Sequence, residues 1–547
     1  MADIASAKLW VALALCLWPH VAGGPMPQQN FAERIIKHIS DSGCDDVLNK
    51  PFFCDRWDET LLIQKAWQEL FRSQIGAALT QNPVSVGNLC NIAVPKSRYT
   101  FRTVSHMSLL DTLKYTALVF SIGSCIEKQR LPKKVVFSNR FDAKRMKLDR
   151  SNYDGFRKES KRLSDSGKYR VKVITDIANY YDRLNLHKLE NLLKEKGCDQ
   201  TTVTKLNAVL TQWSQQQSFG IPVGSDASRL LAEAMLINAD QELAAHRIKF
   251  VRYVDDYRIF CSSQERAYEA MQLLDQALRR EGLFLNSGKT RLIDLTLETE
   301  EHDEEKPEFD PIDVEEKIER TQLIRTRYAS RIAKYYRYPG KEAIEKLRKL
   351  DMAALLAKVA NPNSTEDALK QFVKAAIYAE KLDFSWLQKI IDLYPHLIPY
   401  VVDAIVKEHD RDASRLDSGF RKQAIAKFRA IFRVYARNDY FRIQACRLLC
   451  TLDRRCGEFL SKELLKLTHG GEVIFSQAVY FMEDRIPRAR FLDMLARYSS
   501  YGFFARSSLA ALLQRGCVII GDERRAQMKN LGAGELDPFL TKLLRAI

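Results

Sequence analysis

The spacing of hydrophobic residues divides this chain into a mixed N-terminal half and a helical C-terminal half. From Asn30 to about Thr80, apolar residues recur every three to four positions, as in AERIIKHI, which predicts amphipathic helices. The stretch YRVKVITDI alternates instead, as a half-buried strand does. Beyond residue 319 the apolar runs, such as IQACRLLCTL and SSLAALLQRG, again have helical spacing and are separated by short polar loops.

The order of these elements predicts the domain organisation. Residues 26–95 form an N-terminal helical segment, and residues 96–296 follow a β–α–(turn)–α–β–β–α–β order. That order is typical of an α+β domain whose antiparallel sheet is backed by helices. The acidic segment 297–319 is interpreted as a solvated linker. Residues 320–547 then form an all-α array of the HEAT kind.

Composition narrows the class of partner and the compartment. The chain has 547 residues and a formal net charge of +16, which favours an acidic polymer, nucleic acid ahead of a membrane surface, as partner. Its eleven cysteines contain no CxxC pair, so we expect a reducing, cytoplasmic environment rather than a disulfide framework. Cys446, Cys450 and Cys456 are expected to fill a helical core, with a zinc site as the alternative.

The first 25 residues need a separate interpretation. Their apolar run LWVALALCLW resembles the hydrophobic part of a secretory signal, but it is too short to span a bilayer. We expect Met26 to be the physiological start and residues 1–25 to be a non-native start or a signal-like leader. No membrane partner is expected.

Three aspartates are the strongest candidates for chemistry. Asp176 ends the strand YRVKVITD, and Asp255 and Asp256 separate the strands VRYV and YRIF. In an antiparallel sheet these strand ends can lie side by side, and carboxylates that close repel each other and raise their pKa values. Two Mg²⁺ ions, with Mn²⁺ as the alternative, remove that repulsion and build a phosphoryl-transfer site. The simpler alternative is a polar hairpin turn with a strand-end aspartate.

Residues between and after the aspartates add candidate nucleotide contacts. The ring of Tyr181 can lie under the sugar of a nucleotide and exclude a ribose 2′-hydroxyl; a core aromatic is the alternative. Gly220, Pro222 and Gly224 form an exposed turn before a helix, which a base or template can approach closely. Lys289, in LFLNSGKT, can reach a triphosphate, although a solvated lysine has the same appearance in sequence.

Taken together, these stretches resemble the palm of reverse transcriptases. DIANYYDRL is similar to motif A of that family, FGIPVGSDAS to motif B, YVDD to motif C in the form YxDD, and LFLNSGKT to motif D. The resemblance implies a fingers–palm polymerase of deoxynucleotides with two divalent ions on Asp176, Asp255 and Asp256. It also implies Tyr181 as the sugar gate, Lys289 near the phosphates, and Arg140 as a triphosphate contact.

One departure and one further likeness refine that expectation. Phe219 stands where the family usually has glutamine before the motif B glycine, so template contact is expected to differ. The motif set with a HEAT-like array is most similar to bacterial abortive-infection and antiphage reverse transcriptases, some of which work without a template or from a protein hydroxyl. The partners implied are deoxynucleoside triphosphates and RNA or single-stranded DNA. Monomer and homo-oligomer both stay open.

Two other functions remain as alternatives. One is a catalytically inactive nucleic-acid-binding scaffold with a polymerase shell, against which the three retained aspartates argue. The other is an RNA polymerase variant of the same palm, against which Tyr181 argues.

The segment RTQLIRTRYASRIAKYYRY is the candidate nucleic-acid-binding element of the C-terminal half. It interleaves cations for phosphates with rings for bases, a combination suited to single strands. Its candidate residues are Arg325, Arg327, Arg331, Tyr335 and Tyr336. A solvated helix whose tyrosines face the core is the alternative.

Overall fold

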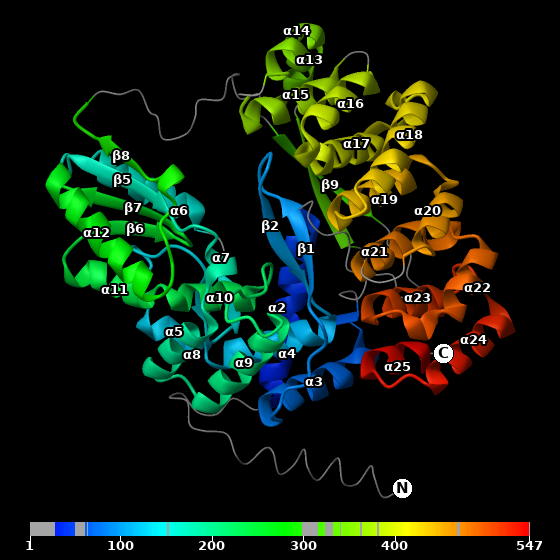
Figure 1. Ribbon diagram of the computed structural model, residues 1–547, viewed down its shortest axis with the longest axis horizontal. Helices are drawn as coiled ribbons and strands as arrows, with labels where there is room; N and C mark the ends of the chain where they lie inside the picture. Colours follow the sequence, from blue (N-terminus) through cyan, green and yellow to red (C-terminus); the bar gives the residue numbers. More distant parts are fainter. Residues whose placement is uncertain are drawn as a thin grey trace, which may run out of the picture. The chain divides into compact units, whose positions relative to one another are not determined.

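The chain folds into two compact units in a computed structural model. The structure describes residues 28–49, 61–62, 64–149, 152–297, 315–322, 332–339, 341–361, 364–379, 382–467 and 471–545. Unit 1 comprises Met1–Ser42, Leu61–Leu89 and Met107–Glu301, and unit 2 comprises Gly43–Thr60, Cys90–His106 and His302–Ile547 (Figure 1). The expected leader, residues 1–25, lies outside the described residues, as do Arg325, Arg327 and Arg331.

Unit 1 is built around a four-stranded antiparallel sheet, as the alternating pattern predicts. Its strand order is β6-β7-β5-β8. The strands are β5 (Val171–Asp176), β6 (Lys249–Tyr253), β7 (Asp256–Cys261) and β8 (Arg291–Asp294). The central strand β7 pairs with β5 and β6, and β5 pairs with β8. This arrangement confirms the expected α+β class.

Unit 1 also contains helices around this sheet and beside it. They are α2 (Gln28–Asn49), α3 (Lys65–Thr80), α4 (Leu109–Ser121), α5 (Gly123–Gln129), α6 (Tyr153–Ser164), α7 (Tyr180–Arg183), α8 (Leu186–Glu195), α9 (Gln200–Trp213), α10 (Asp226–Met235), α11 (Ile237–Ala245) and α12 (Gln264–Arg280). Of these, α6 and α12 contact the strands of the sheet. Helix α6 packs on one face of the sheet, where its Phe156 and Leu163 contact Val251 and Phe260 of the strands. The short strands β3 (Arg140–Asp142) and β4 (Lys147–Asp149) form a separate pair.

A hairpin lies where the sequence predicted a domain boundary. Strands β1 (Cys90–Pro95) and β2 (Phe101–His106) pair antiparallel and belong to unit 2, where β1 contacts α19 (Asp439–Leu452). The expected boundary between residues 95 and 96 therefore falls within this hairpin, at the end of β1. Its basis was charge, and the helical spacing before it gave no sign that Val94 and Val104 would be buried as a strand pair.

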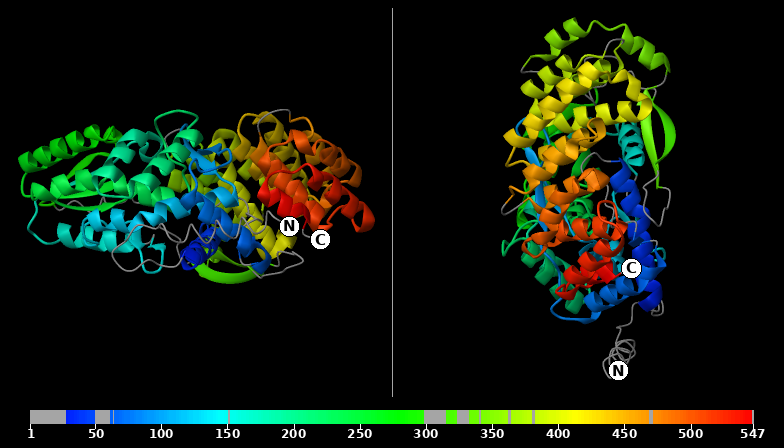
Figure 2. Two further views of the ribbon diagram at one scale, coloured as in Figure 1. Left: turned by 90° about the horizontal axis from the view of Figure 1, so that it is seen from below. Right: turned by 90° about the vertical axis from the view of Figure 1, so that its right-hand side faces the viewer.

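Unit 2 contains an array of helices in which every second helix, from α13 to α25, contacts the next one of that series. In this way α17 (Ile398–Asp412) contacts α15 (Glu366–Tyr378) and α19 (Asp439–Leu452), and the series continues through α21 (Glu472–Met482) and α23 (Phe503–Arg515) (Figure 1; Figure 2). This pattern is that of the predicted helical array. The other helices are α13 (Lys341–Arg348), α14 (Met352–Val359), α16 (Phe384–Leu393), α18 (Ser418–Val434), α20 (Cys456–Leu464), α22 (Arg488–Ala496), α24 (Gly521–Ala533) and α25 (Pro538–Arg545).

The start of this C-terminal half differs from the prediction. Strands β9 (Glu315–Gln322) and β10 (Ile332–Pro339) pair antiparallel, where a linker and then a helix were expected. Tyr335 and Tyr336 therefore lie on a strand, opposite Glu319 and Ile318 in register. The tyrosines and Ile332 of IAKYYRYP favour a strand over a helix, and their local preference outweighs the helical spacing of the cations.

Two further expectations concern membranes and metals. No single helix in the described ranges has the length and apolarity to cross a bilayer; α4 and α5 meet the criterion only as a pair bent by 47°. Cys446, Cys450 and Cys456 are buried, and the last two lie with their Sγ atoms 3.4 Å apart. Their burial is what the core interpretation expects, and no group of three metal-ligating side chains forms around them among the described residues.

Candidate active site

The fold brings the three predicted carboxylates to one end of the sheet. In the register between β5 and β7, Asp176 lies directly opposite Asp256. Asp255 precedes Asp256 in the turn between β6 and β7. Tyr253 and Asp256 are the last pair of opposite residues before this turn. Asp176 and Asp256, 80 positions apart along the chain, therefore meet because one ends β5 and the other begins the adjacent strand β7.

The pKa values of two carboxyl groups at this site are raised. Burial and the neighbouring Asp176 carboxylate raise the pKa of Asp255 to about 7. Burial also raises the pKa of Asp256, although the Arg258 guanidinium opposes the shift. Oδ1 of Asp256 is buried and has no hydrogen-bond partner. An unpartnered buried carboxylate oxygen is a ligand atom for a hard cation.

Lys289 is the one predicted cation that the structure places against these carboxylates. Its Nζ atom lies 2.8 Å from Oδ2 of Asp176, and its side chain is 57% exposed. Backbone contacts fix the loop: Asn286 donates its N–H to the carbonyl of Asp176 at 2.7 Å, and Ala178 donates to Phe284 at 2.9 Å. Strand β5 and the loop before β8 therefore present Asp176 and Lys289 together.

The three carboxylates fit divalent ions by donor type and charge. No three His, Cys, Asp or Glu side chains in the described part of the chain already enclose a single ion position. Even so, Asp176, Asp255 and Asp256 supply the hard oxygen ligands that Mg²⁺ prefers. Oδ1 of Asp256 has no hydrogen-bond partner, and the raised pKa of Asp255 reflects its burial and the nearby Asp176 carboxylate.

The two tyrosines after Asp176 differ in burial, as the sequence suggested. Tyr180 is 3% exposed, and its hydroxyl donates to the carbonyl of Ala232, so it is the core residue of the pair. Tyr181 is half-buried, and its ring centroid lies 5.6 Å from that of Tyr180. Burial raises the pKa of the Tyr181 hydroxyl. Tyr181 therefore stays the candidate sugar gate.

The predicted glycine turn lies against the chain that follows Asp176. Gly220 donates its N–H to the carbonyl of Leu184 at 2.9 Å, and Ile221 donates to that of Tyr181 at 3.2 Å. Gly220 and Gly224 have φ angles of +90° and +122°, which L side chains rarely adopt. The turn thus depends on glycine, and it brings the backbone around Pro222 beside the Tyr181 segment.

One local prediction gains no support from the structure. Arg140 was expected to contact a triphosphate, but its Nη2 pairs with Glu127 Oε1 and its Nη1 donates to the carbonyl of Leu131 at 3.0 Å. These partners engage the guanidinium inside unit 1, which leaves the expected triphosphate contact without support.

Sequence reasoning missed a buried charge cluster behind the turn that carries Asp255. Arg252, Glu233 and Asp240 are each at most 2% exposed, and Arg252 forms ion pairs with both carboxylates. The signal was present in FVRYV, because an arginine on the buried face of a strand requires a buried carboxylate nearby. The acidic partners could not be chosen from sequence, since Glu233 and Asp240 come from two separate helices.

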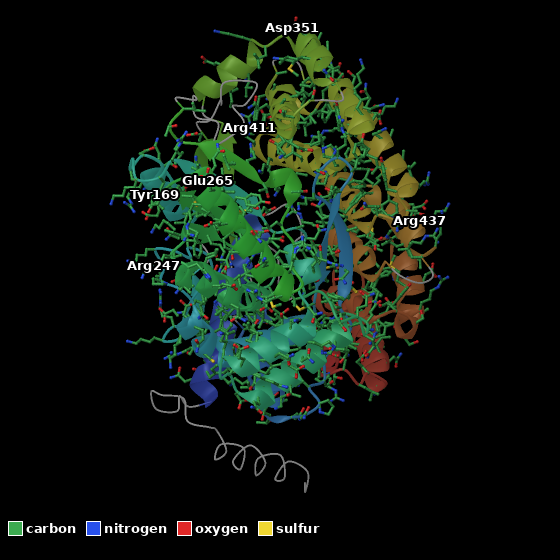
Figure 3. All side chains as sticks on the ribbon, turned by 60° about the vertical axis from the view of Figure 1, so that its left-hand side comes forward. Tyr169, Arg247, Glu265, Asp351, Arg411 and Arg437 are labelled. Atoms are coloured by element: carbon green, nitrogen blue, oxygen red, sulfur yellow. The ribbon has the colours of Figure 1, made fainter. Side chains whose placement is uncertain are left out.

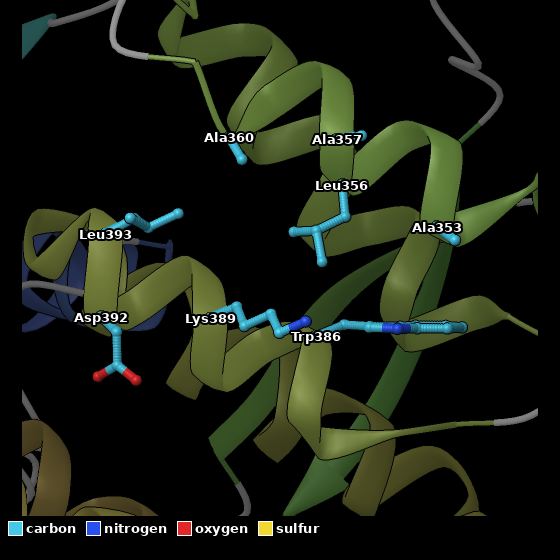
Figure 4. Close-up of a pocket in the computed structure, with 8 residues that line it drawn as sticks. All are labelled: Ala353, Leu356, Ala357, Ala360, Trp386, Lys389, Asp392 and Leu393. Atoms are coloured by element: carbon cyan, nitrogen blue, oxygen red, sulfur yellow. The ribbon is translucent and has the colours of Figure 1, made fainter.

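One apolar cavity of unit 2 offers no comparable chemistry. It has a volume of about 540 Å³ and lies between α14 and α16, lined by Leu356, Trp386 and Leu393 among others (Figure 4). Lys389 and Asp392 are its charged residues. It holds no group of carboxylates, so we place the candidate active site at the sheet of unit 1.

Comparison with known proteins agrees with this assignment. Residues 127–340 match the family described as reverse transcriptase (RNA-dependent DNA polymerase). These residues carry a reverse transcriptase domain. The match includes Asp176, Asp255, Asp256 and Lys289, and it spans less than half of the chain, so the domain alone is identified by it.

The remaining comparisons are less informative. No curated protein matches the chain. Among solved structures, apo telomerase from Candida tropicalis is similar at 14% sequence identity, over 76% of this chain and 74% of that one, with a TM-score of 0.29. A TM-score this low does not establish a shared overall fold. The reverse transcriptase domain therefore rests on the family match.

Proposed function

We propose that the protein is an RNA-directed DNA polymerase that adds deoxynucleotides at the carboxylate end of the unit 1 sheet. One observation carries the proposal: Asp176 and Asp256 face each other across β5 and β7, with Asp255 in the adjoining turn and Lys289 at Asp176. The reverse transcriptase domain at residues 127–340 includes all four residues.

Asp176, Asp255 and Asp256 would hold two Mg²⁺ ions, with Mn²⁺ as an alternative. When bound, such ions activate a 3′-hydroxyl and neutralise charge on the triphosphate. The residues of the chain provide positioning. Strand pairing between β5 and β7 keeps the carboxylates aligned before substrate arrives, which lowers the reorganisation that phosphoryl transfer requires.

Lys289 and Tyr181 would act on the incoming nucleotide. The Lys289 ammonium is 57% exposed, so it can turn from Asp176 toward a triphosphate once other cations balance the carboxylates. The Tyr181 ring would close the space that a 2′-hydroxyl needs and so favour deoxynucleotides. The backbone from Gly220 to Gly224 would contact the base pair, because its turn has no side chain at either glycine.

Nucleic-acid binding by unit 2 is part of the same proposal. The candidates are Arg325, Arg327 and Arg331 with Tyr335 and Tyr336 of β10. Both units expose further cations, such as Arg247 after α11 and Arg437 after α18 (Figure 3). Replacing the three candidate arginines by glutamine should reduce the log–log salt slope of single-strand binding by roughly 0.7 for each phosphate that an arginine no longer neutralises.

The biological setting that we propose is antiphage defence in the cytoplasm. Its support is the motif set of FGIPVGSDAS and LLAE together with a helical array. Protection of cells against phage by the wild-type chain, lost in Asp256→Asn, would test this part separately from the polymerase activity.

The direct test of the polymerase is nucleotide incorporation by the purified full chain. We would supply Mg²⁺ with either deoxynucleotides or ribonucleotides, with and without an RNA template and a primer. Deoxynucleotide incorporation that requires the RNA template supports the proposal. Incorporation without any template would indicate template-independent synthesis. Nucleic-acid binding with no incorporation under any condition would favour the inactive scaffold.

A further inference from the structure

The turn that carries Asp255 contains a residue in an unfavourable conformation. Val254 has a φ angle of +54°, in the left-handed region. A β-branched side chain is disfavoured there, because its Cβ substituents crowd the following carbonyl. A free hairpin with valine at this position would relax to another conformation, so the surrounding structure has to hold the turn.

Two side chains hold the backbone of Val254 from both sides. Its N–H donates to Oγ of Ser138 at 2.8 Å, and its carbonyl accepts from Nη1 of Arg252 at 2.7 Å. Both polar groups of Val254 are therefore bonded to side chains of other residues. The conformation of Val254 depends on where those two side chains are fixed.

Ser138 and Arg252 are fixed by one buried carboxylate. Glu233, on α10, accepts a hydrogen bond from Ser138 at Oε1 and lies 2.9 Å from Nη1 of Arg252 at Oε2. Arg130 Nη2 also binds Glu233 at 2.8 Å, and Nη2 of Arg252 binds Asp240 at 2.6 Å. The exposed fraction of the Arg252 and Glu233 side chains is at most 1%.

The backbone fixes the same segment independently of these charges. Phe137 donates its N–H to the carbonyl of Arg252 at 2.9 Å, and Arg252 donates to the carbonyl of Val135 at 2.8 Å. The stretch from Val135 to Phe137 thus runs along β6 as an additional short strand partner. This places Ser138 beside the turn even when its hydroxyl is removed.

We propose that Ser138, Glu233 and Arg252 are positioning residues that keep Val254 left-handed and thereby set the carboxylates of Asp255 and Asp256. A relaxed turn would move Asp255 relative to Asp176, which is held separately by β5. The consequence for catalysis rests on the proposed polymerase function. The structural consequence, a turn that loses its conformation without Ser138, does not.

The first experiment compares Ser138→Ala with Ser138→Thr in the full chain. Ser138→Ala should lower kcat for deoxynucleotide addition roughly 10- to 100-fold, the scale of a small misplacement of reacting groups, with KM little changed. Ser138→Thr keeps the hydroxyl and should restore most of the rate. Asn207→Ala, which removes a 2.7 Å hydrogen bond to Glu190 between α9 and α8, should leave kcat unchanged.

A double-mutant cycle then separates positioning from a general loss of stability. Glycine adopts a φ of +54° without strain, so a turn with Val254→Gly no longer needs to be held. The fold-change caused by Ser138→Ala should therefore be much smaller in the Val254→Gly background than in the Val254 background. An equal fold-change in both backgrounds would overturn the proposal.

A third measurement needs no enzymatic activity, so it separates this proposal from the proposed function. Hydrogen exchange at the Val254 amide should be faster in Ser138→Ala than in the wild-type chain and unchanged in Asn207→Ala. Faster exchange in Ser138→Ala, combined with no nucleotide incorporation by the wild-type chain, would support the positioning role of Ser138 and reject the polymerase function. Unchanged exchange at Val254 would reject the positioning device whatever the activity.

Discussion

The two units bury charge for different purposes. In unit 1, Arg252 and Glu233 are bonded to a backbone turn and to the segment beside it, so the buried pair fixes the conformation of a site. In unit 2, the fully buried Glu408 binds Arg411 and Arg415 at 2.7 and 2.8 Å, at the end of α17. Buried charged side chains therefore hold a strained turn in unit 1, whereas in unit 2 they form ion pairs at the end of a helix.

The difference shows what each unit requires of its sequence. A helical array is stabilised by contacts between neighbouring helices, so its parts tolerate change when local packing is kept. The sheet of unit 1 must keep three carboxylates together against their mutual repulsion, which requires support from distant segments. Core substitutions of similar size should therefore affect activity in the sheet of unit 1 and only stability in the helical array of unit 2.

The largest expected effect follows loss of a carboxylate. Asp256→Asn or Asp255→Asn should lower deoxynucleotide incorporation by about 10³-fold or more. These carboxylates would hold the cations that stabilise the negative charge of the transition state. Because burial raises the pKa of both residues, removing their charge should not lower the Tm of the ion-free protein. Asp294→Asn, on β8 of the same sheet, is the control and should retain activity. Full activity of either site variant would exclude these residues from the mechanism.

Core truncation tests the contrast between the units directly. Ile259 of β7 and Ile405 of α17 are both fully buried. Replacement of either by alanine should cost about 2–5 kcal/mol of unfolding free energy. Below its transition temperature, Ile405→Ala should keep the wild-type kcat, whereas Ile259→Ala should lower it because β7 carries Asp256. Equal kcat values for the two variants would remove the contrast.

Sugar selectivity should change by a smaller factor. Tyr181→Ala should raise ribonucleotide use relative to deoxynucleotide use about tenfold, the lower end of what a single pocket group discriminates. Tyr180→Phe removes only the hydroxyl that binds the Ala232 carbonyl and should leave that ratio unchanged. Competition between matched nucleotides gives the ratio in one assay. A ratio unaffected by Tyr181→Ala would make Tyr181 a core residue.

The smallest effect concerns the stability of unit 2 in acid. Burial alone would raise the pKa of Asp403, but Arg447 and Lys407 outweigh it and lower the pKa below its usual value of 3.8. A lowered pKa means that this carboxylate stabilises the fold above about pH 4 and loses that contribution as pH falls further. Asp403→Asn should therefore lower Tm at neutral pH, by an amount that shrinks as the pH falls below about 4. A Tm difference that is constant with pH would contradict this.

Sequence patterns predicted the parts of the site that depend on local alternation. The strand ending at Asp176 and the strands flanking Asp255 were expected, and their antiparallel pairing brings the three carboxylates together. Lys289, which was expected to reach a triphosphate, lies beside Asp176, and its role at a phosphate stays a prediction. In each case the residue lies within a few positions of a strand whose period is visible in sequence.

Features that depend on distant partners were not predicted. Glu233 and Arg252 lie 19 residues apart on a helix and a strand, and only the fold brings them together. The hairpin of β1 and β2 joins unit 2 through contacts with a helix more than 300 residues away, which no local pattern indicates. Arg140 was assigned as a triphosphate contact because the sequence resembles reverse transcriptases. Its ion pair with Glu127 was not foreseen.

The central claim is that Asp176, Asp255 and Asp256 form one cation site in unit 1. Its most direct test is calorimetric titration of Mn²⁺ into the wild-type chain, Asp256→Asn and Asp294→Asn, each with a non-reactive deoxynucleoside triphosphate. We expect Asp294→Asn to bind Mn²⁺ with the wild-type affinity and Asp256→Asn to lose a binding event. Identical titration curves for all three proteins would contradict the claim.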